Sequence, residues 1–448
     1  MVSMNPKTGH GFVSWCLMGI LWGPMSAGSL RATAAEHRPE LVMVALSGHL
    51  IGSGYRPESF SPDDVRAWVA ACDEMGVTRI LWRGAYVGKA TYHSKVLPVM
   101  EVMEEDHFEK AGVRKKGGYR RVKWEPIRKN FNHKARLIQQ FDVLDVALAE
   151  AKKRGISFYA DLALFDTYFP GLENDFFEAH PEYFVLARDQ KTPCRPIPCY
   201  AEKAVQDYRL AEIEELLARG VDGISFGLSC HYAGAGAGDP DSFGFNPPVV
   251  QAFQDRYGID ILQDDFDADK LCALNGEMFT GFLRRVRELL GPQRKMIAAV
   301  TLKGWHGYGG PAGAKLGISM TDDAPEPGKP LYRFDLEWET WIREGIADDL
   351  MVYAPMPDAV GRVQRTIKSR LTKGSVFLWR EVWEDKEFDA YRDEIAAIRG
   401  GAIDGYAVDE LQQFLPEMSP AGHADWRKSR EVLEGLKSKN ILFEIRLT

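Results

Sequence analysis

Cysteine is scarce in this sequence, with 6 among 448 residues. One of the six, Cys16, lies in an N-terminal apolar segment, so an odd number remains in the rest of the chain. Cys194 and Cys199 occur in the sequence CRPIPC and either close a small disulfide in an oxidising compartment or stay as two free thiols. Because a single CxxxxC has no second pair of ligands, it carries no zinc signature.

Long apolar runs are also lacking, except for one near the N-terminus. Lys7 precedes the apolar residues 11–22, and the small residues 32–34 follow. That order is typical of a secretory signal peptide, and the run is short for a membrane span. We therefore expect a signal peptide at 1–35, a mature chain at 36–448 without a membrane span, and a periplasmic or secreted location. An uncleaved anchor is the alternative.

Positive charge is in deficit, with 56 Lys and Arg against 64 Asp and Glu and a net charge of −8. This balance argues against nucleic acid as a partner. Residues 110–129 are the exception, because they hold many Lys and Arg and a single acid, Glu125. They form either a solvated basic loop or a lid over an anionic sugar, uronic or sulfated, which would also suit Lys89.

Motifs for phosphate and metal binding are absent as well. Gly234, Gly236 and Gly238 fit neither GxGxxG nor GxxxxGK, and Asp239 and Pro240 follow them in place of a helix. No HxH or HExxH spacing links the histidines. We therefore expect neither a metal nor a cofactor.

Strand-like apolar runs alternate with stretches of helical length, which predicts an α/β fold. Pro62 and Pro247 follow the candidate helix caps Ser61 and Asn246, and Gly258 ends the second of these helices. The predicted strands cover residues 41–47, 78–83, 156–161, 221–227, 296–303, 350–353, 375–381 and 405–409. Eight such units favour a single (β/α)8 TIM barrel over a doubly wound sheet. The long segments after the second and third strands, 84–130 and 167–200, are expected to be functional.

Four motifs in order carry a family resemblance: GKATYHSKVLP (88–98), FFEAHPEYFVLARD (176–189), AVQDYRLAEIEELLARGVDGISF (204–226) and NPPVVQAFQDRYGIDI (246–261). Together they resemble bacterial family-10-like glycosyl hydrolases. The resemblance implies an exported, carbohydrate-active (β/α)8 barrel. That group usually has an acid where this chain has Lys89, and another where it has Gly227 at the end of the fourth strand.

Catalytic candidates follow from the barrel, whose active sites lie at the carboxyl ends of the strands. Glycoside hydrolysis needs two carboxyl groups, one acting as acid and one as base or nucleophile. Asp161, Glu381 and Asp409 end strands and point inward by the alternation of side chains, and Glu410 lies beside them. We expect Glu381 and Asp409 to form the working pair, with Asp161 able to replace either. Alternatively, such acids cap helices or pair with arginine.

Aromatic and basic side chains near the strand ends are candidates for substrate binding, because aromatic faces stack on sugar rings and cations or histidines bind hydroxyls or a carboxylate. An aromatic ring in the core is the alternative. The candidates are Trp82, Arg83, Lys89, His93, His231, Lys303, Trp305, Tyr353, Trp379, Arg380 and Trp383.

The leading hypothesis is therefore an exported glycoside hydrolase that acts on a poly- or oligosaccharide. Gly227 and Lys89, which stand where the related group has acids, motivate a second hypothesis, a non-catalytic glycan-binding barrel. A sugar lyase with His or Tyr as base is a third. The sugar, the linkage, the stereochemical outcome and the oligomeric state stay open.

Overall fold

The computed structural model describes residues 39–51, 60–86, 88–110, 124–165, 167, 172, 174–227, 242–302, 308–309, 315–318, 332–354, 358–381 and 388–409. The expected signal peptide lies outside these residues.

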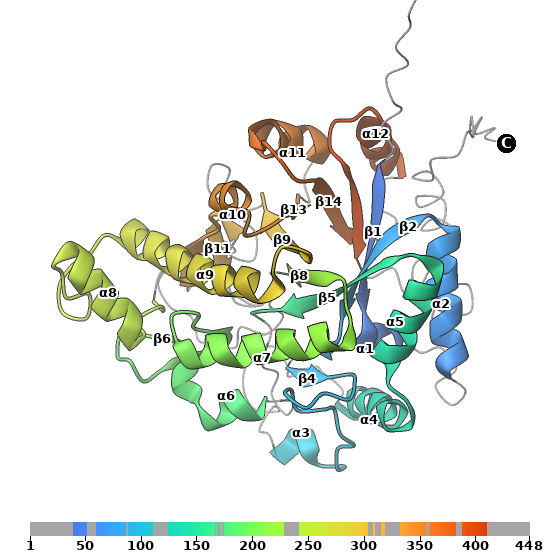
Figure 1. Ribbon diagram of the computed structural model, residues 1–448. Coiled ribbons are helices and arrows are strands. Elements are labelled where there is room, and N and C mark those ends of the chain that lie inside the picture. Colours follow the sequence, from blue (N-terminus) through green and yellow to red (C-terminus); the bar gives the residue numbers. More distant parts are fainter. Residues whose placement is uncertain are drawn as a thin grey trace, which may run out of the picture. The chain divides into compact units, whose positions relative to one another are not determined.

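Parallel strands close into a barrel in the described part of the chain (Figure 1). Neighbouring strands in the barrel are also consecutive along the chain, and the last strand pairs with the first. The strands are β1 (Glu40–Leu46), β2 (Val77–Arg83), β5 (Ser157–Ala163), β8 (Gly223–Gly227), β9 (Lys295–Thr301), β13 (Asp349–Tyr353), β14 (Val376–Glu381) and β15 (Gly405–Asp409). The predicted (β/α)8 barrel is confirmed, and each predicted strand overlaps an observed one.

Helices connect these strands and cover the outside of the barrel (Figure 1). The helices that run back between successive strands are α2 (Pro62–Glu74), α5 (Val143–Arg154), α7 (Lys203–Arg219), α9 (Ala268–Leu290), α10 (Trp338–Glu344), α11 (Ala359–Thr366) and α12 (Phe388–Arg399). Further helical segments are α1 (Ser47–Leu50), α3 (His107–Lys110), α4 (Trp124–Gln140), α6 (Asp175–Ala179), α8 (Pro247–Tyr257) and the 3-10 turns Pro181–Tyr183 and Lys368–Arg370.

The long segments after β2 and β5 contain secondary structure of their own. Short antiparallel pairs form between β3 (Ala85–Tyr86) and β4 (Lys89–Ala90), and between β6 (Phe184–Leu186) and β7 (Pro193–Pro198). A further small sheet consists of β10 (Tyr308–Gly309), β11 (Lys315–Ile318) and β12 (Tyr332–Asp335). All three sheets belong to segments that follow barrel strands, so they add to the carboxyl end of the barrel, where the site is expected.

The helix signals in the sequence work as expected. Asp64 accepts the backbone N–H of Ser61 at 2.7 Å at the start of α2. Helix α8 starts at Pro247 and ends at Tyr257. The capping residue Gly258 has a φ of 69°, the left-handed conformation that glycine adopts most readily.

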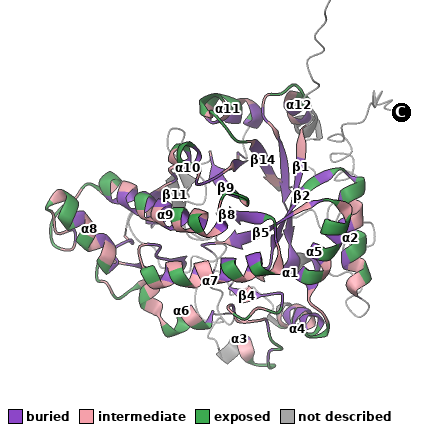
Figure 2. Ribbon diagram, viewed as in Figure 1, coloured by how far each residue is buried: buried purple, intermediate pink, exposed green. Residues whose placement is uncertain are grey.

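Strand residues alternate between the barrel interior and the helical layer. Phe226 packs its ring against Phe279 of α9 and Trp341 of α10, with centroids 5.9 and 6.0 Å away. Its neighbour Ser225 instead donates a hydrogen bond to Asp161 on the next strand. Figure 2 shows the result, with the barrel strands buried and the outer helices exposed on one face only.

A salt-bridge cluster lies at the amino end of the barrel. The guanidinium of Arg79 contacts Asp349 at 2.5 Å and Glu40 at 2.9 Å. Arg79 and Asp349 belong to β2 and β13, on opposite sides of the barrel. Their direct contact therefore crosses the interior and fills it at the end away from the expected site.

Candidate active site

Asp161 lies in the barrel interior, but it is already engaged. Arg83 of β2 donates to its Oδ2 from Nε at 2.7 Å and lies 2.6 Å away through Nη2. The hydroxyl of Ser225 in β8 donates to the other carboxylate oxygen. The Asp161 side chain has no exposed surface. The alternative of an arginine-paired strand-end acid therefore describes Asp161, and Arg83 is its partner.

Asp409 has a different environment at the end of β15. It is buried, and its Oδ2 accepts a hydrogen bond from the indole Nε1–H of Trp379 at 3.0 Å. In the strand register Asp409 is directly paired with Glu381 of β14. Backbone atoms of neighbouring strands lie about 4.8 Å apart. The two acids that we expected to work together therefore occupy adjacent positions on adjacent strands.

An aromatic pair adjoins this carboxylate. Tyr353 of β13 is in register with Trp379 of β14, and the two ring centroids lie 5.2 Å apart. Tyr353 is half-buried and Trp379 is buried. The structure thus brings Tyr353, Trp379 and Asp409 together on three consecutive strands.

Two of the proposed binding residues face the wrong way. Trp82 is only 1% exposed, and its ring packs between Trp68 of α2 and Phe158 of β5. Arg380 forms an ion pair with Glu394 of α12, in the helical layer. Because neighbouring side chains in a strand alternate, Trp82 cannot point inward beside Arg83, nor Arg380 beside Trp379. The assignment of Trp82 and Arg380 to substrate binding is therefore wrong.

Lys89 of β4 has an acidic partner. Its Nζ lies 3.2 Å from Oδ1 of Asp175 at the start of α6. The Lys89 side chain is 21% exposed and that of Asp175 is 80% exposed, so the ion pair lies at the protein surface. The positive charge that suggested an anionic substrate is thus balanced within the protein.

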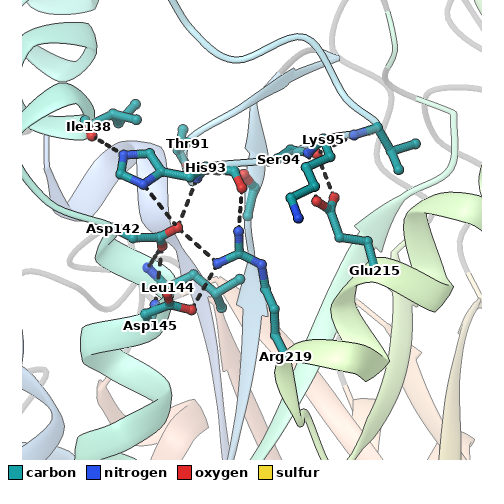
Figure 3. Close-up of polar contacts among 12 residues, drawn as sticks. Thr91, His93, Ser94, Lys95, Ile138, Asp142, Leu144, Asp145, Glu215 and Arg219 are labelled. Atoms are coloured by element: carbon teal, nitrogen blue, oxygen red, sulfur yellow. Dashed lines mark hydrogen bonds and ion pairs between the residues drawn. The ribbon is translucent and has the colours of Figure 1, made fainter.

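His93 anchors a loop (Figure 3). Its Nε2 lies 2.6 Å from the carbonyl oxygen of Ile138, and its backbone N–H donates to Asp142 at 2.9 Å. Arg219 of α7 joins the same group, because it donates to Asp142 at 2.8 Å and to the carbonyl oxygen of His93. These contacts tie the 88–98 segment to α5 and α7, so His93 has a structural role in the described part of the molecule.

The motifs that carry the family resemblance meet one another in two places. In the first, Glu215 of α7 accepts the Ser94 hydroxyl and the Lys95 backbone N–H, both at 2.6 Å, next to the contacts of Arg219 (Figure 3). In the second, Asn246 accepts the backbone N–H of Leu186 at 2.9 Å and donates to the carbonyl oxygen of Phe184 at 2.9 Å. These motifs therefore encode the docking of loops onto helices.

The remaining site predictions lie outside the described residues or outside the described side chains. Glu410, His231, Lys303, Trp305 and Trp383 belong to the first group, as does most of the basic segment 110–129. Of Glu381 the structure describes the backbone. Among the described residues, no group of three or more His, Cys, Asp and Glu is placed to hold a metal ion. No helix among the described residues is long and apolar enough to cross a membrane.

Sequence reasoning missed several polar residues of the interior. Ser225 supports Asp161, and Arg79 with Asp349 fills the amino end of the barrel. Arg209 and Glu212 form a buried ion pair at 2.7 Å on the inner face of α7. The spacing of Arg209 and Glu212 with Val205 was the available signal, because these residues lie on one stripe of the helix.

Cys194 and Cys199 are separate buried thiols. Burial is the main cause that raises the pKa of each to about 12, from an ordinary value of 9.0. Burial also raises the pKa of Tyr159 and Tyr208 to about 12. All four groups are therefore neutral in the folded protein at pH values where the unfolded chain begins to lose their protons.

We expect the protein to lose stability in alkali for this reason. A group with a raised pKa stabilises the fold fully below its unfolded pKa, and this contribution falls as the pH rises toward the folded value. Each thiol should then remove about 1.4 kcal/mol of unfolding free energy per pH unit above pH 9. Urea unfolding at pH 8, 9.5 and 10.5 measures this loss. Cys194→Ala should show a shallower decline, and an equally steep one would contradict the assignment.

Comparison with known protein families and with curated proteins gives no match. Solved structures give matches of low similarity. An exo β-N-acetylglucosaminidase from Vibrio harveyi is 11% identical, with a TM-score of 0.45, over 90% of this chain and 54% of its own. A β-N-acetylhexosaminidase from Bacteroides fragilis is 9% identical, with a TM-score of 0.42, over 91% of this chain and 68% of its own. Tryptophan synthase from M. tuberculosis is 13% identical, with a TM-score of 0.35, over 90% of this chain and 92% of its own.

These neighbours include glycoside hydrolases with low identity to this chain, and the chain spans about half the length of the Vibrio harveyi enzyme. At these identities and scores they carry no inference about activity. The resemblance to family-10-like glycosyl hydrolases stays a prediction.

Proposed function

We propose that the protein is an exported glycoside hydrolase that cleaves a poly- or oligosaccharide with Glu381 and Asp409. The observation that carries the proposal is their pairing in register at the carboxyl ends of β14 and β15. This is the end of a (β/α)8 barrel at which active sites lie. The aromatic rings of Tyr353 and Trp379 beside Asp409 supply a surface of the kind that packs against sugar rings.

The register also supports a proposal on stereochemistry. Retaining enzymes hold their carboxyl groups about 5–5.5 Å apart, whereas inverting enzymes leave about 6.5–9.5 Å for a water molecule. Adjacent positions on adjacent strands, with backbones about 4.8 Å apart, suit the shorter separation. We therefore propose retention through a covalent glycosyl–enzyme intermediate.

The described cations do not support an anionic substrate. Arg83, Lys89 and Arg380 are paired with Asp161, Asp175 and Glu394, respectively. A preference for uronic or sulfated sugars would have to come from residues 110–129 or Lys303. We therefore propose that the sugar next to Asp409 is uncharged.

A glycan panel tests the function. We expect new reducing ends from at least one neutral polysaccharide, and the first anomer seen by proton NMR should keep the configuration of the substrate. The Asp409→Asn variant should release no reducing ends and serves as the control. Binding without release would favour the glycan-binding barrel, and unsaturated products absorbing in the ultraviolet would favour the lyase. Faster cleavage of uronic than of neutral glycans at low salt alone would contradict an uncharged sugar.

A further inference from the structure

The contact between Trp379 and Asp409 has a defined direction. An indole N–H only donates, so the carboxylate oxygen of Asp409 must accept at the observed 3.0 Å. Hydrogen bonds of this kind to an ionised acceptor are roughly twice as strong as neutral ones. The contact therefore favours the ionised carboxylate and fixes the orientation of its Oδ2 atom.

The ring that provides this N–H is itself held in place. Trp379 is 5% exposed, and Tyr353 packs against it from β13, with an angle of 56° between the ring planes. Asp409 comes from β15, on the other side of β14. Trp379 thus contacts side chains on both neighbouring strands, which fix the position of its ring. Its N–H can therefore keep the Asp409 carboxylate in one orientation.

Asp161 is held by an arginine and a serine and not by an aromatic N–H. Both of its oxygens are occupied, one by Arg83 and the other by Ser225. A carboxylate in a buried ion pair would leave an uncompensated arginine if it formed a bond with substrate. Asp161 is therefore a poor candidate for the reacting carboxylate.

We propose that Trp379 is a positioning residue, whose indole N–H keeps Asp409 ionised and aimed as the nucleophile. This inference rests on the proposed glycoside hydrolysis. In that reaction an oxygen of Asp409 bonds to the anomeric carbon while the glycosidic C–O bond breaks, and Glu381 gives its proton to the departing oxygen. Water then attacks the anomeric carbon and returns a proton to Glu381, and Asp409 leaves as a carboxylate.

Two replacements of Trp379 separate the hydrogen bond from the ring. Trp379→Phe removes the N–H and part of the ring, and β-(3-benzothienyl)alanine at this position keeps the bicyclic shape but replaces N–H by sulfur. Both should lower kcat by about ten- to a hundredfold, as expected for a hydrogen bond to a charged group. The acidic limb of the pH–rate profile should move to higher pH, because the charged form loses a donor.

Trp82→Phe is the matched control. Trp82 also lies near the end of a barrel strand, but its ring is in the core between Trp68 and Phe158. This variant should lose stability and keep the wild-type pH profile. An unchanged profile in the benzothienyl variant would overturn the proposal even if Trp379→Phe failed to fold.

An NMR measurement tests the hydrogen bond between Trp379 and Asp409 without the need for enzymatic turnover. In protein with 15N-labelled indole groups, the Nε1–H signal that disappears in Trp379→Phe identifies Trp379. We expect this signal to titrate with pH and to move in Asp409→Asn. A signal that neither titrates with pH nor moves in Asp409→Asn would overturn the proposal. If no glycan were cleaved while the signal did titrate, the hydrolase would be rejected and the control of Asp409 by Trp379 retained.

Discussion

Asp409→Asn is expected to lower kcat/KM by about a thousandfold or more, and Glu381→Gln by a similar factor. An amide has nearly the same shape as a carboxylate, and the Asn carbonyl still accepts the Trp379 N–H. The fold should therefore be kept, while the negative charge needed for attack at the anomeric carbon is lost. Steady-state rates on the glycan that the wild-type protein cleaves, with urea unfolding in parallel, provide the measurement.

Asp161→Asn is the matched comparison, because it makes the same chemical change on a different strand. This replacement leaves Arg83 buried at 6% side-chain exposure without its anion, which should cost about 3–5 kcal/mol of stability. Asp409→Asn should thus remove activity with little loss of stability, and Asp161→Asn should do the reverse. Full turnover in Asp409→Asn, or a stable but inactive Asp161→Asn, would assign the chemistry to the other carboxylate.

The barrel could be predicted from sequence because its strands are short apolar runs at regular spacing. β15, for example, has the predicted bounds of residues 405–409. The inward direction of Asp161 and Asp409 could also be predicted, since alternation depends only on position in the strand. Applied throughout, the same rule would have excluded Trp82 beside Arg83 and Arg380 beside Trp379.

Partners across the barrel could not be predicted in this way. The pairing of Arg83 with Asp161, or of Arg79 with Asp349, depends on the relative stagger of the strands, which local sequence does not fix. Lys89 shows the consequence. Its charge suggested an anionic ligand, whereas the structure shows a surface ion pair with Asp175, on a helix that begins 86 residues later.

The family-like motifs show a different limit of sequence reasoning. The 88–98 motif contacts α5 and α7 through His93, Ser94 and Lys95. Asn246, from the last motif, binds the backbone near Phe184 in the second. A resemblance that rests on these residues therefore identifies a way of attaching loops to neighbouring helices and strands. It does not locate the carboxylates that we propose to react, Glu381 and Asp409, which lie on strands outside the motifs.

Replacing the buried Arg209–Glu212 pair by apolar residues is expected to cost little or to stabilise the protein, although each single replacement should be harmful. The pair bonds through Nη1 at 2.7 Å, but in the described part of the chain Nε and Nη2 of Arg209 are buried without a hydrogen-bond partner. Burial is the largest single effect and acts to lower the pKa of Arg209. The Glu212 charge, the nearby Tyr200 and Tyr208 and the hydrogen bond to Glu212 together outweigh it, so the net pKa is raised. The ion pair therefore persists at a high desolvation cost.

Arg209→Met alone leaves Glu212 as a buried unpaired charge and should cost about 3–5 kcal/mol, whereas Arg209→Met with Glu212→Leu should return to wild-type stability or exceed it. Urea unfolding of the two singles and the double completes the cycle. The exposed pair Arg256–Glu277, also at 2.7 Å, is the control, and its coupling should be at most about 1 kcal/mol. A double variant as unstable as the singles together would show that the charges on α7 stabilise the fold by more than their desolvation costs.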